Sequence, residues 1–153
     1  MADLSPKALK TRASLLDAAR NELLELNGAL EVSRVAERAG VSVGLIYRYF
    51  GSRAGLLAAV AEDYYERYQA QVMAADPLPD SADWCSREEQ RVQRAVQFVY
   101  GEPLAALVLV SLAREPEVAA LEARCIADNV RQGADNIRRG QIFRWPGAQR
   151  RGA

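Results

Sequence analysis

The sequence predicts an all-α protein, in which a three-helix N-terminal domain with a helix-turn-helix is joined to a C-terminal helical bundle. Three observations lead to this prediction. Apolar residues recur every three or four positions, no segment alternates apolar and polar residues as a half-buried strand does, and glycine or proline separates the periodic stretches. Hydrophobic residues make up 50% of the 153 residues, which is enough for a packed core.

Three short helices are expected within about residues 9–50. The pair Asn27-Gly28 ends the first, because both residues tolerate a left-handed backbone. The second is predicted at Val32–Ala39 and the third at Val43–Phe50, with a tight turn at 40–42 between them. Residues three or four positions apart share a helix face, and the apolar face of the first helix is therefore predicted to carry Leu16, Ala19, Leu23 and Leu26.

Longer helices are expected to form the rest of the chain. A capping box that starts at Ser86 opens one of them, and the apolar run Leu104–Ala113 predicts another that is buried on most sides. Gly140 is expected to close the last helix, before an irregular tail at Gln141–Ala153. The predicted order is a fourth helix at Arg53–Ala75 with the stripe Leu57, Val60, Tyr64 and Tyr68, a loop at Asp76–Ser81, a fifth helix from Ser86 to Tyr100, a sixth at Leu104–Ala113 and a seventh at Glu117–Arg139.

Residues 32–50 have the pattern of a helix-turn-helix. Two short helices that cross over a tight turn need a small residue where they touch, here Ala36, and a residue that accepts a positive φ, here Gly40. Ser42 stands where it can cap the second of the two helices. The small core between the helices is predicted to consist of Val35, Ala39, Val41 and Ile46.

The helix after this turn is expected to lie in the major groove of double-stranded DNA. Its outward residues would be Val43, Gly44, Tyr47 and Arg48. Val43 can touch a thymine methyl group, Gly44 allows a close approach, and Tyr47 can bond a phosphate. Arg53 can reach another phosphate beside the free amides at the start of the next helix. An αα-corner used only for packing is the alternative interpretation of this segment.

From about Leu15 to Val60 the sequence resembles the DNA-binding region of TetR-family transcriptional regulators. The matching stretches are Leu15–Ala19, Val35–Ser42, Gly44–Arg53 and Gly55–Leu57. The resemblance implies a DNA-binding domain at 1–53 and, at 54–153, a helical domain that dimerises and binds a small effector. It implies a homodimer that represses a promoter until the effector binds. It also implies that family positions near DNA are filled here by Ser42, Val43, Gly44, Leu45, Tyr47, Tyr49 and Arg53.

Four departures from the family pattern affect these expectations: Glu31, Val43 in place of a frequent Lys or other polar residue, Tyr49 in place of a frequent His, and the length of the chain. Glu31 stands where the family often has a capping Thr or Ser that also touches phosphate, so Ser33 is expected to take over that contact, and Arg34 is added to the predicted DNA contacts. The family normally continues with two more helices that build the dimer interface. We therefore expect a shortened C-terminal domain and weakened dimerisation.

An effector pocket is predicted among the later helices, for a small apolar or aromatic molecule. The alternative for each candidate is plain core packing. The candidate lining residues are Tyr64, Tyr68, Trp84, Phe98, Tyr100 and Leu107.

Composition argues against several other classes. The chain has no histidine, which removes the usual general base and the commonest transition-metal ligand, so we expect no enzyme, catalytic residue, cofactor or metal site. The N-terminus has no secretion signal and the longest apolar run is too short to cross a bilayer, so we expect a cytoplasmic protein without a membrane partner. Two other functions stay open: a helical interaction module of this fold that has lost operator binding, and a protein that sequesters small molecules.

Overall fold

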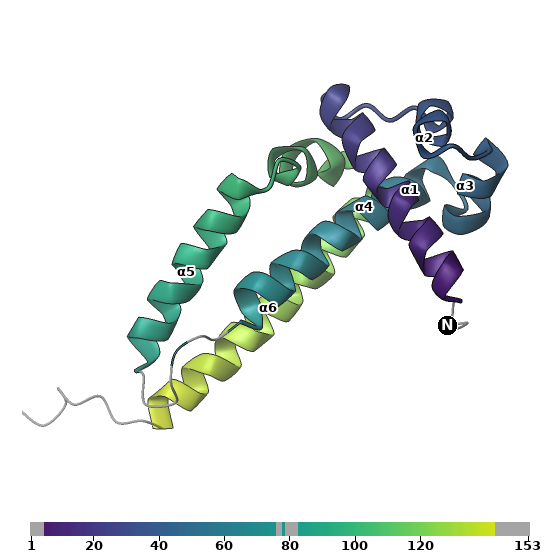
Figure 1. Cartoon of the computed structure of the whole chain (residues 1–153). Helices are drawn as coiled ribbons and strands as arrows, with labels where there is room; N and C mark the ends of the chain where they lie inside the picture. Colours follow the sequence, from purple (N-terminus) through teal and green to yellow (C-terminus); the bar gives the residue numbers. More distant parts are fainter. Residues whose placement is uncertain (1–4, 76–77, 79–82, 143–153) are drawn as a thin grey trace, which may run out of the picture.

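The computed structural model describes residues 5–75, 78 and 83–142, and the described residues form helices and connecting turns without a strand (Figure 1). The N-terminal helices are α1 (Pro6–Glu25), α2 (Val32–Ala39) and α3 (Val43–Phe50). The predicted all-α fold class is confirmed, and so are the bounds predicted for α2 and α3.

Local signals set the two ends of α1. Ser5 caps its start by accepting a hydrogen bond from the amide of Ala8 at 3.3 Å. After the helix, Asn27 and Gly28 have φ angles of 49° and 96°, as the predicted stop requires. The predicted apolar face is confirmed for the three residues that are buried, Leu16, Ala19 and Leu23.

The fourth predicted helix is α4 (Arg53–Tyr68) followed directly by η1 (Gln69–Met73), a π-helical segment that ends two residues before Ala75. Leu57, Val60 and Tyr64 of its predicted stripe are buried. The predicted loop Asp76–Ser81 lies, except for Leu78, outside the described residues.

The fifth helix, α5 (Trp84–Gly101), begins earlier than predicted. Asp83 is its N-cap: one carboxylate oxygen accepts the amide of Ser86 at 3.0 Å and the other accepts the Ser86 hydroxyl at 2.8 Å. The predicted capping box at Ser86 is therefore wrong. A carboxylate three residues earlier already satisfies the free amide of Ser86, so the helix starts there.

The apolar run after Pro103 is not the single buried α-helix that was predicted. It contains η2 (Leu107–Ser111), which is π-helical, and η3 (Leu112–Arg114), a 3-10 turn. The wider and tighter turns change the phase of the segment, which places Leu107, Val108 and Leu112 in the core and leaves Leu109 and Val110 exposed.

The last helix, α6 (Pro116–Ile142), starts one residue before the predicted start and continues through Gly140. The predicted end at Gly140 is therefore wrong, and so is the irregular structure predicted for residues 141 and 142. The rest of the predicted irregular tail, 143–153, lies outside the described residues.

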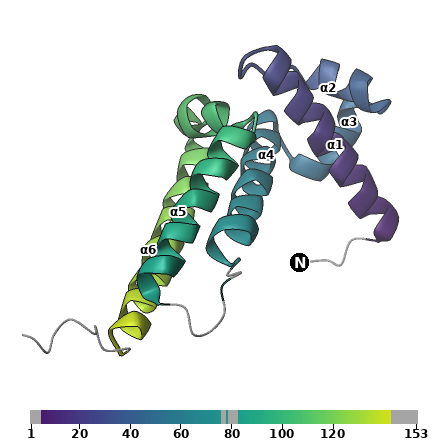
Figure 2. The ribbon, with the colours of Figure 1, turned by 60° about the vertical axis from the view of Figure 1, so that its left-hand side comes forward.

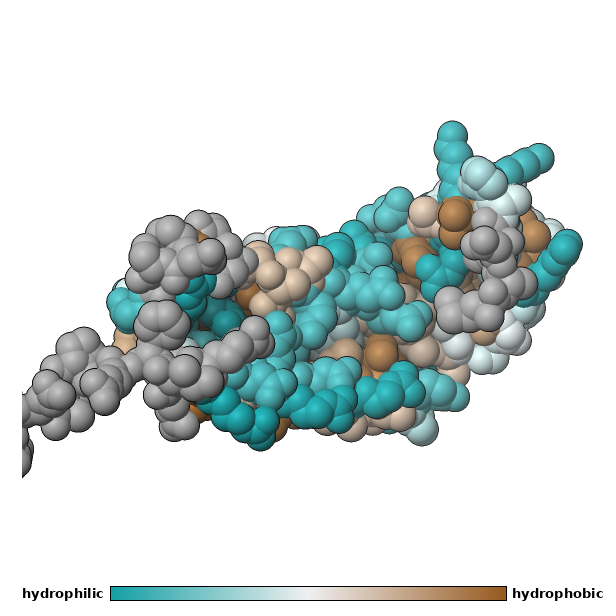
Figure 3. Space-filling model, turned by 90° about the horizontal axis from the view of Figure 1, so that it is seen from below, coloured by the Kyte–Doolittle hydropathy of each residue, from teal (hydrophilic) through white to brown (hydrophobic). Residues whose placement is uncertain are grey.

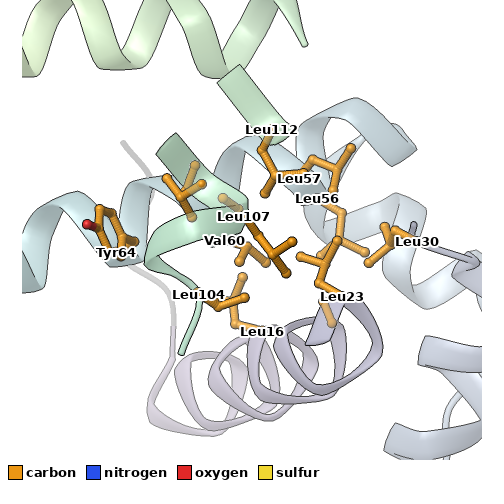
Figure 4. Close-up of a cluster of buried hydrophobic side chains, with 14 of the residues drawn as sticks. Leu16, Leu23, Leu30, Leu56, Leu57, Val60, Tyr64, Leu104, Leu107 and Leu112 are labelled. Atoms are coloured by element: carbon orange, nitrogen blue, oxygen red, sulfur yellow. The ribbon is translucent and has the colours of Figure 1, made fainter. Parts of the chain in front are cut away.

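One hydrophobic cluster joins the two halves of the chain. Figure 4 shows leucines of α1, of α4 and of the segment 104–112 packed against one another in this cluster. A chain of ion pairs also joins the two halves. Asp63 of α4 pairs with Arg20 of α1 and with Arg67, and Arg67 in turn pairs with Glu102 after α5. The N-terminal helices are thus anchored on the bundle by both apolar and ionic contacts.

The described part of the bundle is built on the pair of helices α4 and α6. In Figures 1 and 2, α6 lies along α4, and the N-terminal helices sit at the end of the pair where α6 begins. None of the described residues of α5 is fully buried. Seen from below, hydrophilic residues cover most of the described surface, with hydrophobic residues between them (Figure 3).

Candidate nucleic-acid interface

The turn between α2 and α3 has the predicted geometry. Gly40 adopts a left-handed conformation with φ of 66°, and the next amide, of Val41, donates to the carbonyl of Ala36 at 2.9 Å. The hydroxyl of Ser42 accepts the amide of Leu45 at 3.3 Å and so caps α3. The predicted roles of Gly40 and Ser42 in this turn are confirmed.

The inner faces of α2 and α3 fix the angle between the two helices. Val35 and Ile46 are fully buried and Ala36 is 3% exposed, while Ala39 and Val41 pack partly buried around them. This is the small core that the sequence predicted. Because Ile46 is held from the inside, the opposite side of α3 is presented to solvent in a fixed orientation.

Five residues form that outer side, which we call the recognition face: Ser42, Val43, Gly44, Tyr47 and Arg48. All five are exposed, although apolar side chains such as Val43 and Tyr47 usually avoid water; these two are 37% and 44% exposed. Leu45 and Tyr49, also predicted to lie near DNA, are half-buried, and the ring of Tyr49 lies 6.2 Å from that of Phe50. The structure thus separates the predicted α3 residues into an exposed set and a partly packed set.

Arg34, predicted to contact DNA, is engaged within the protein. Its Nε lies 2.6 Å from Oε1 of Glu22, and its Nη2 lies 3.5 Å from Oε2 of Glu25. Arg38 binds the same two acids, at 3.5 Å to Glu22 and 2.6 Å to Glu25. The hydrogen bond to Glu25 is the main reason why the pKa of Arg38 lies above its ordinary value. Both guanidinium groups therefore attach α2 to α1.

Glu22 was not among the residues predicted from the sequence. Its side chain is fully buried, and it faces two arginines of α2. A carboxylate that is taken out of water needs such partners, so this cluster fixes the position of α2. The one signal in the sequence was that Glu22 lies between Ala19 and Leu23, on the inner face of the first helix.

Arg53 and Ser33 lie at the edges of the candidate interface. Arg53, the first residue of α4, donates from Nε to the carbonyl of Leu30 at 3.1 Å and pairs through Nη1 with Glu115 at 3.4 Å. Its side chain is still 45% exposed. Ser33 is exposed in the first turn of α2, whose N-cap, Glu31, makes no side-chain cap bond.

The six residues predicted to line an effector pocket are not gathered around one cavity. Tyr64 is buried in an aromatic contact with Phe98, whose ring also meets Tyr68, whereas Trp84 and Tyr100 are 39% and 88% exposed. Leu107 is buried beside the segment that follows α1, where it approaches Gly28. Spacing along helices did not show which neighbours cover each ring, and an effector pocket formed by these residues stays a prediction.

An open groove of about 400 Å³ lies between α4 and α5, and Phe98 is the one predicted residue in its wall. Most of its lining is polar or charged, which does not fit the apolar pocket that the sequence suggested. The lining residues are Arg67, Gln71, Arg94, Gln97, Phe98, Gly101 and Glu102.

Other site types find no support in the part of the chain that the structure describes. Within it, no cluster of three or more cysteine or acidic residues has a geometry that could hold a metal ion. The described helices also include none that is long and apolar enough to cross a membrane.

Comparison with known proteins agrees with this geometry. Residues 15–60, which contain α2, α3 and the first part of α4, match the model of bacterial regulatory proteins of the tetR family. The HTH-type transcriptional repressor LfrR of Mycolicibacterium smegmatis is 31% identical to the chain over 115 residues. The chain belongs to the TetR family.

The likeness to TetR-family proteins extends beyond the helix-turn-helix. The match to LfrR covers 72% of this chain and 57% of the repressor, so the chain spans a little over half the length of that relative. A putative tetR family transcription regulator from Shewanella sp. PV-4 has a similar fold, with a TM-score of 0.67 over 89% of this chain and 74% of that chain at 21% identity.

Proposed function

We propose that this TetR-family chain is a DNA-binding transcriptional regulator, acting as a repressor, and that the recognition face of α3 enters the major groove of an operator. The supporting observation is the outer side of α3: Val43 and Tyr47 are exposed beside Gly44, on a short helix whose inner side is held by Ile46. A rigid helix that presents a methyl group, a phenol and a bare backbone suits contacts with base edges and phosphates.

The proposed contacts fall into two groups. Val43 and Gly44 approach the bases, while Ser42, Tyr47 and Arg48 bond bases or phosphates from the same helix. Ser33 and Arg53 stand at the edges, where the free amides at the starts of α2 and α4 favour a phosphate. Leu45 and Tyr49 support the face from their half-buried positions. Arg34, which the buried Glu22 holds, is left out of the proposed contacts.

The proposal extends to the domains, the assembly and the regulation of the chain. We propose a DNA-binding domain at 1–53 and a helical domain at 54–153, a homodimer, and release of the operator by a small molecule, with no catalytic step. Since the predicted pocket residues are dispersed, we propose no chemical class for that small molecule. We also propose that this transcriptional regulator acts in the cytoplasm.

The experiment compares Tyr47→Ala with Tyr100→Ala, the same change on an exposed tyrosine of α5. Binding to the DNA upstream of the chain's own gene is followed by fluorescence anisotropy at several salt concentrations. The parent and Tyr100→Ala are expected to bind equally, with an affinity that falls as salt rises, because bound phosphates release counterions. Tyr47→Ala is expected to bind about 10-fold more weakly at an unchanged melting temperature.

Equal binding by all three proteins would show that α3 is not the recognition helix. A second candidate function, an interaction module that no longer binds operators, is favoured by Glu31: this exposed carboxylate stands at the start of α2 without a capping bond, where it would repel a phosphate. Sequence-independent, micromolar binding by the parent and by both variants would support that module and contradict the regulator.

A further inference from the structure

Most of the positive charge of the N-terminal helices is used inside the protein. Residues 1–53 carry eight basic side chains, and five of these, all arginines, form ion pairs with acids. Two of the five attach α2 to α1, and the other three pair with acids at positions 62, 63 and 115. The five arginines are Arg12, Arg20, Arg34, Arg38 and Arg53.

Three cations of the N-terminal helices keep an uncompensated charge. Lys7, Lys10 and Arg48 are exposed, and none of them pairs with an acid in the part of the chain that the structure describes. Arg48 belongs to the recognition face. Lys7 and Lys10 lie outside that face, in the first two turns of α1, and their charges have no partner to explain them.

The position of the lysines does not favour the helix that carries them. The free amides at the start of a helix make that end partly positive, so acids stabilise the first turn and cations do not. The first turn of α1 contains no acid, and Lys7 is its second residue. An anion bound there would be attracted both by the amides and by the ammonium groups.

Lysine is also suited to a different partner from the arginines of these helices. A guanidinium group is planar and pairs with a carboxylate in a fixed geometry, which is how the five arginines hold one element on another. An ammonium group is a compact charge on a flexible stem, and it can bind a phosphate without a fixed orientation. Lys7 and Lys10 are the two lysines of the whole sequence, and both lie at the start of α1.

The start of α1 lies beside the end of the recognition helix. The guanidinium carbon of Arg12 is 5.7 Å from the centre of the ring of Phe50, the last residue of α3. A helix rises about 1.5 Å per residue, so Lys10 and Lys7 follow within about 8 Å along α1. In Figures 1 and 2, the start of α1 and α3 both lie on the side of the molecule away from α5.

This placement brings both lysines near the backbone of DNA that α3 would bind. The major groove is about 12 Å wide, so a helix inside it has phosphates on both sides. Lys7 and Lys10 are three positions apart and therefore share one side of α1. Their two ammonium groups can thus reach the same strand.

We propose that Lys7 and Lys10 bind backbone phosphates of the operator beside the groove that α3 enters, so that the start of α1 supplies much of the ionic part of the affinity while α3 reads the bases. This inference rests on the proposed function and adds to it two binding residues outside the helix-turn-helix. Phosphates are alike in every sequence, so these contacts fix the domain on the duplex without selecting the operator.

Salt titrations of DNA binding test the role of the two lysines. The double variant Lys7→Gln/Lys10→Gln is compared with Arg131→Gln/Arg138→Gln, which removes the same charge from exposed positions in the second half of α6. Binding to the duplex from the region upstream of the chain's own gene is followed by fluorescence anisotropy. The plot of log association constant against log salt concentration should be less steep by about 2 for each bound copy of the lysine variant.

Two further expectations follow from the same titrations. The lysine variant should bind at least about 10-fold more weakly than the parent at 0.1 M salt and approach it near 1 M, whereas the arginine variant should keep the slope of the parent. Lys7→Arg/Lys10→Arg, which keeps the charge, should restore the slope. Melting temperatures should not fall, since both lysines are exposed and the first turn of α1 gains nothing from them.

A scrambled duplex of the same length separates phosphate contacts from base contacts. The ratio of the affinities for the two duplexes should be equal for the parent and the lysine variant. An unchanged slope in the lysine variant, or a lower ratio, overturns the inference and leaves the regulator intact. A parent that binds neither duplex contradicts the proposed function itself, and this inference with it.

Discussion

A single buried carboxylate, that of Glu22 in α1, helps to fix the position of α2. Glu22 has no exposed surface, while Glu25, one turn later on α1, is 50% exposed, and both bind Arg34 and Arg38. The sequence could not reveal this cluster, since Arg34 and Arg38 lie 12 and 16 positions after Glu22. Their approach to Glu22 depends on how α2 packs against α1. Arg34 and Arg38 thus hold α2 in position on α1.

Glu22→Gln is expected to lower the free energy of unfolding by about 2 kcal/mol, because it leaves two arginines facing a neutral side chain in a buried site. The half-exposed guanidinium groups can recover some hydration, which keeps the loss below that of a fully buried pair. Glu25→Gln, the same change with the same partners in a solvated position, should cost less than about 1 kcal/mol. Equal losses in urea titrations would contradict the assigned difference in burial.

Among the helices, the bounds predicted from the sequence are most accurate where a local signal sets the end of the helix. Gly40 and Ser42 fix the end of α2 and the start of α3 within three residues, so both helices were predicted with their observed bounds. The segment 104–114 was mispredicted because tertiary contacts with α1 and α4 set the phase of its turns. For the same reason the effector pocket stays a prediction, since helical spacing places Tyr64 and Tyr100 on helix faces without showing what packs on them.

The junction of α3 and α4 depends on a close approach at Gly55. A Cβ atom there would lie 2.0 Å from the carbonyl oxygen of Phe50, which is backbone and cannot turn aside. Gly55→Ala is expected to cost about 2 kcal/mol or more of unfolding free energy and to displace α3 from α4. Gly44→Ala, whose Cβ would meet only the Ser42 hydroxyl at 3.9 Å, should raise stability by about 0.5 kcal/mol and still weaken DNA binding. Thermal unfolding of both variants checks the contrast, and similar melting temperatures would refute it.

The start of α5 is expected to respond to pH. The amide of Ser86, followed by its hydroxyl, lowers the pKa of Asp83 below its ordinary value of 3.8, so the ionised carboxylate stabilises the cap above that value and the stabilisation is lost as pH falls through the lowered pKa. Amide exchange in the first turn of α5 should therefore accelerate as pH falls below 3.8, after correction for intrinsic rates. In Asp83→Asn, which keeps an oxygen acceptor without the charge, this dependence should vanish; its persistence would exclude Asp83 as the cause.

At the scale of the whole molecule, the N-terminal helices and the bundle share one core and one ionic chain. The sequence predicted an N-terminal three-helix domain joined to a helical bundle. It did not show that one core runs through both, because that core contains residues more than 80 positions apart, such as Leu23 and Leu107. Of the candidate site, the outer side of α3 followed from helical periodicity, whereas the engagement of Arg34 by Glu22 followed only once the structure had shown how α2 packs on α1.

The central claim is that the recognition face of α3 is the part of the protein that meets DNA. Backbone amide NMR of the labelled chain, with and without a duplex from the region upstream of its gene, tests it most directly. The largest shifts are expected in residues 42–48 and at the starts of α2 and α4, while those of α5 are expected to stay small. Large shifts in α5 or in the second half of α6, with α3 unchanged, would contradict it.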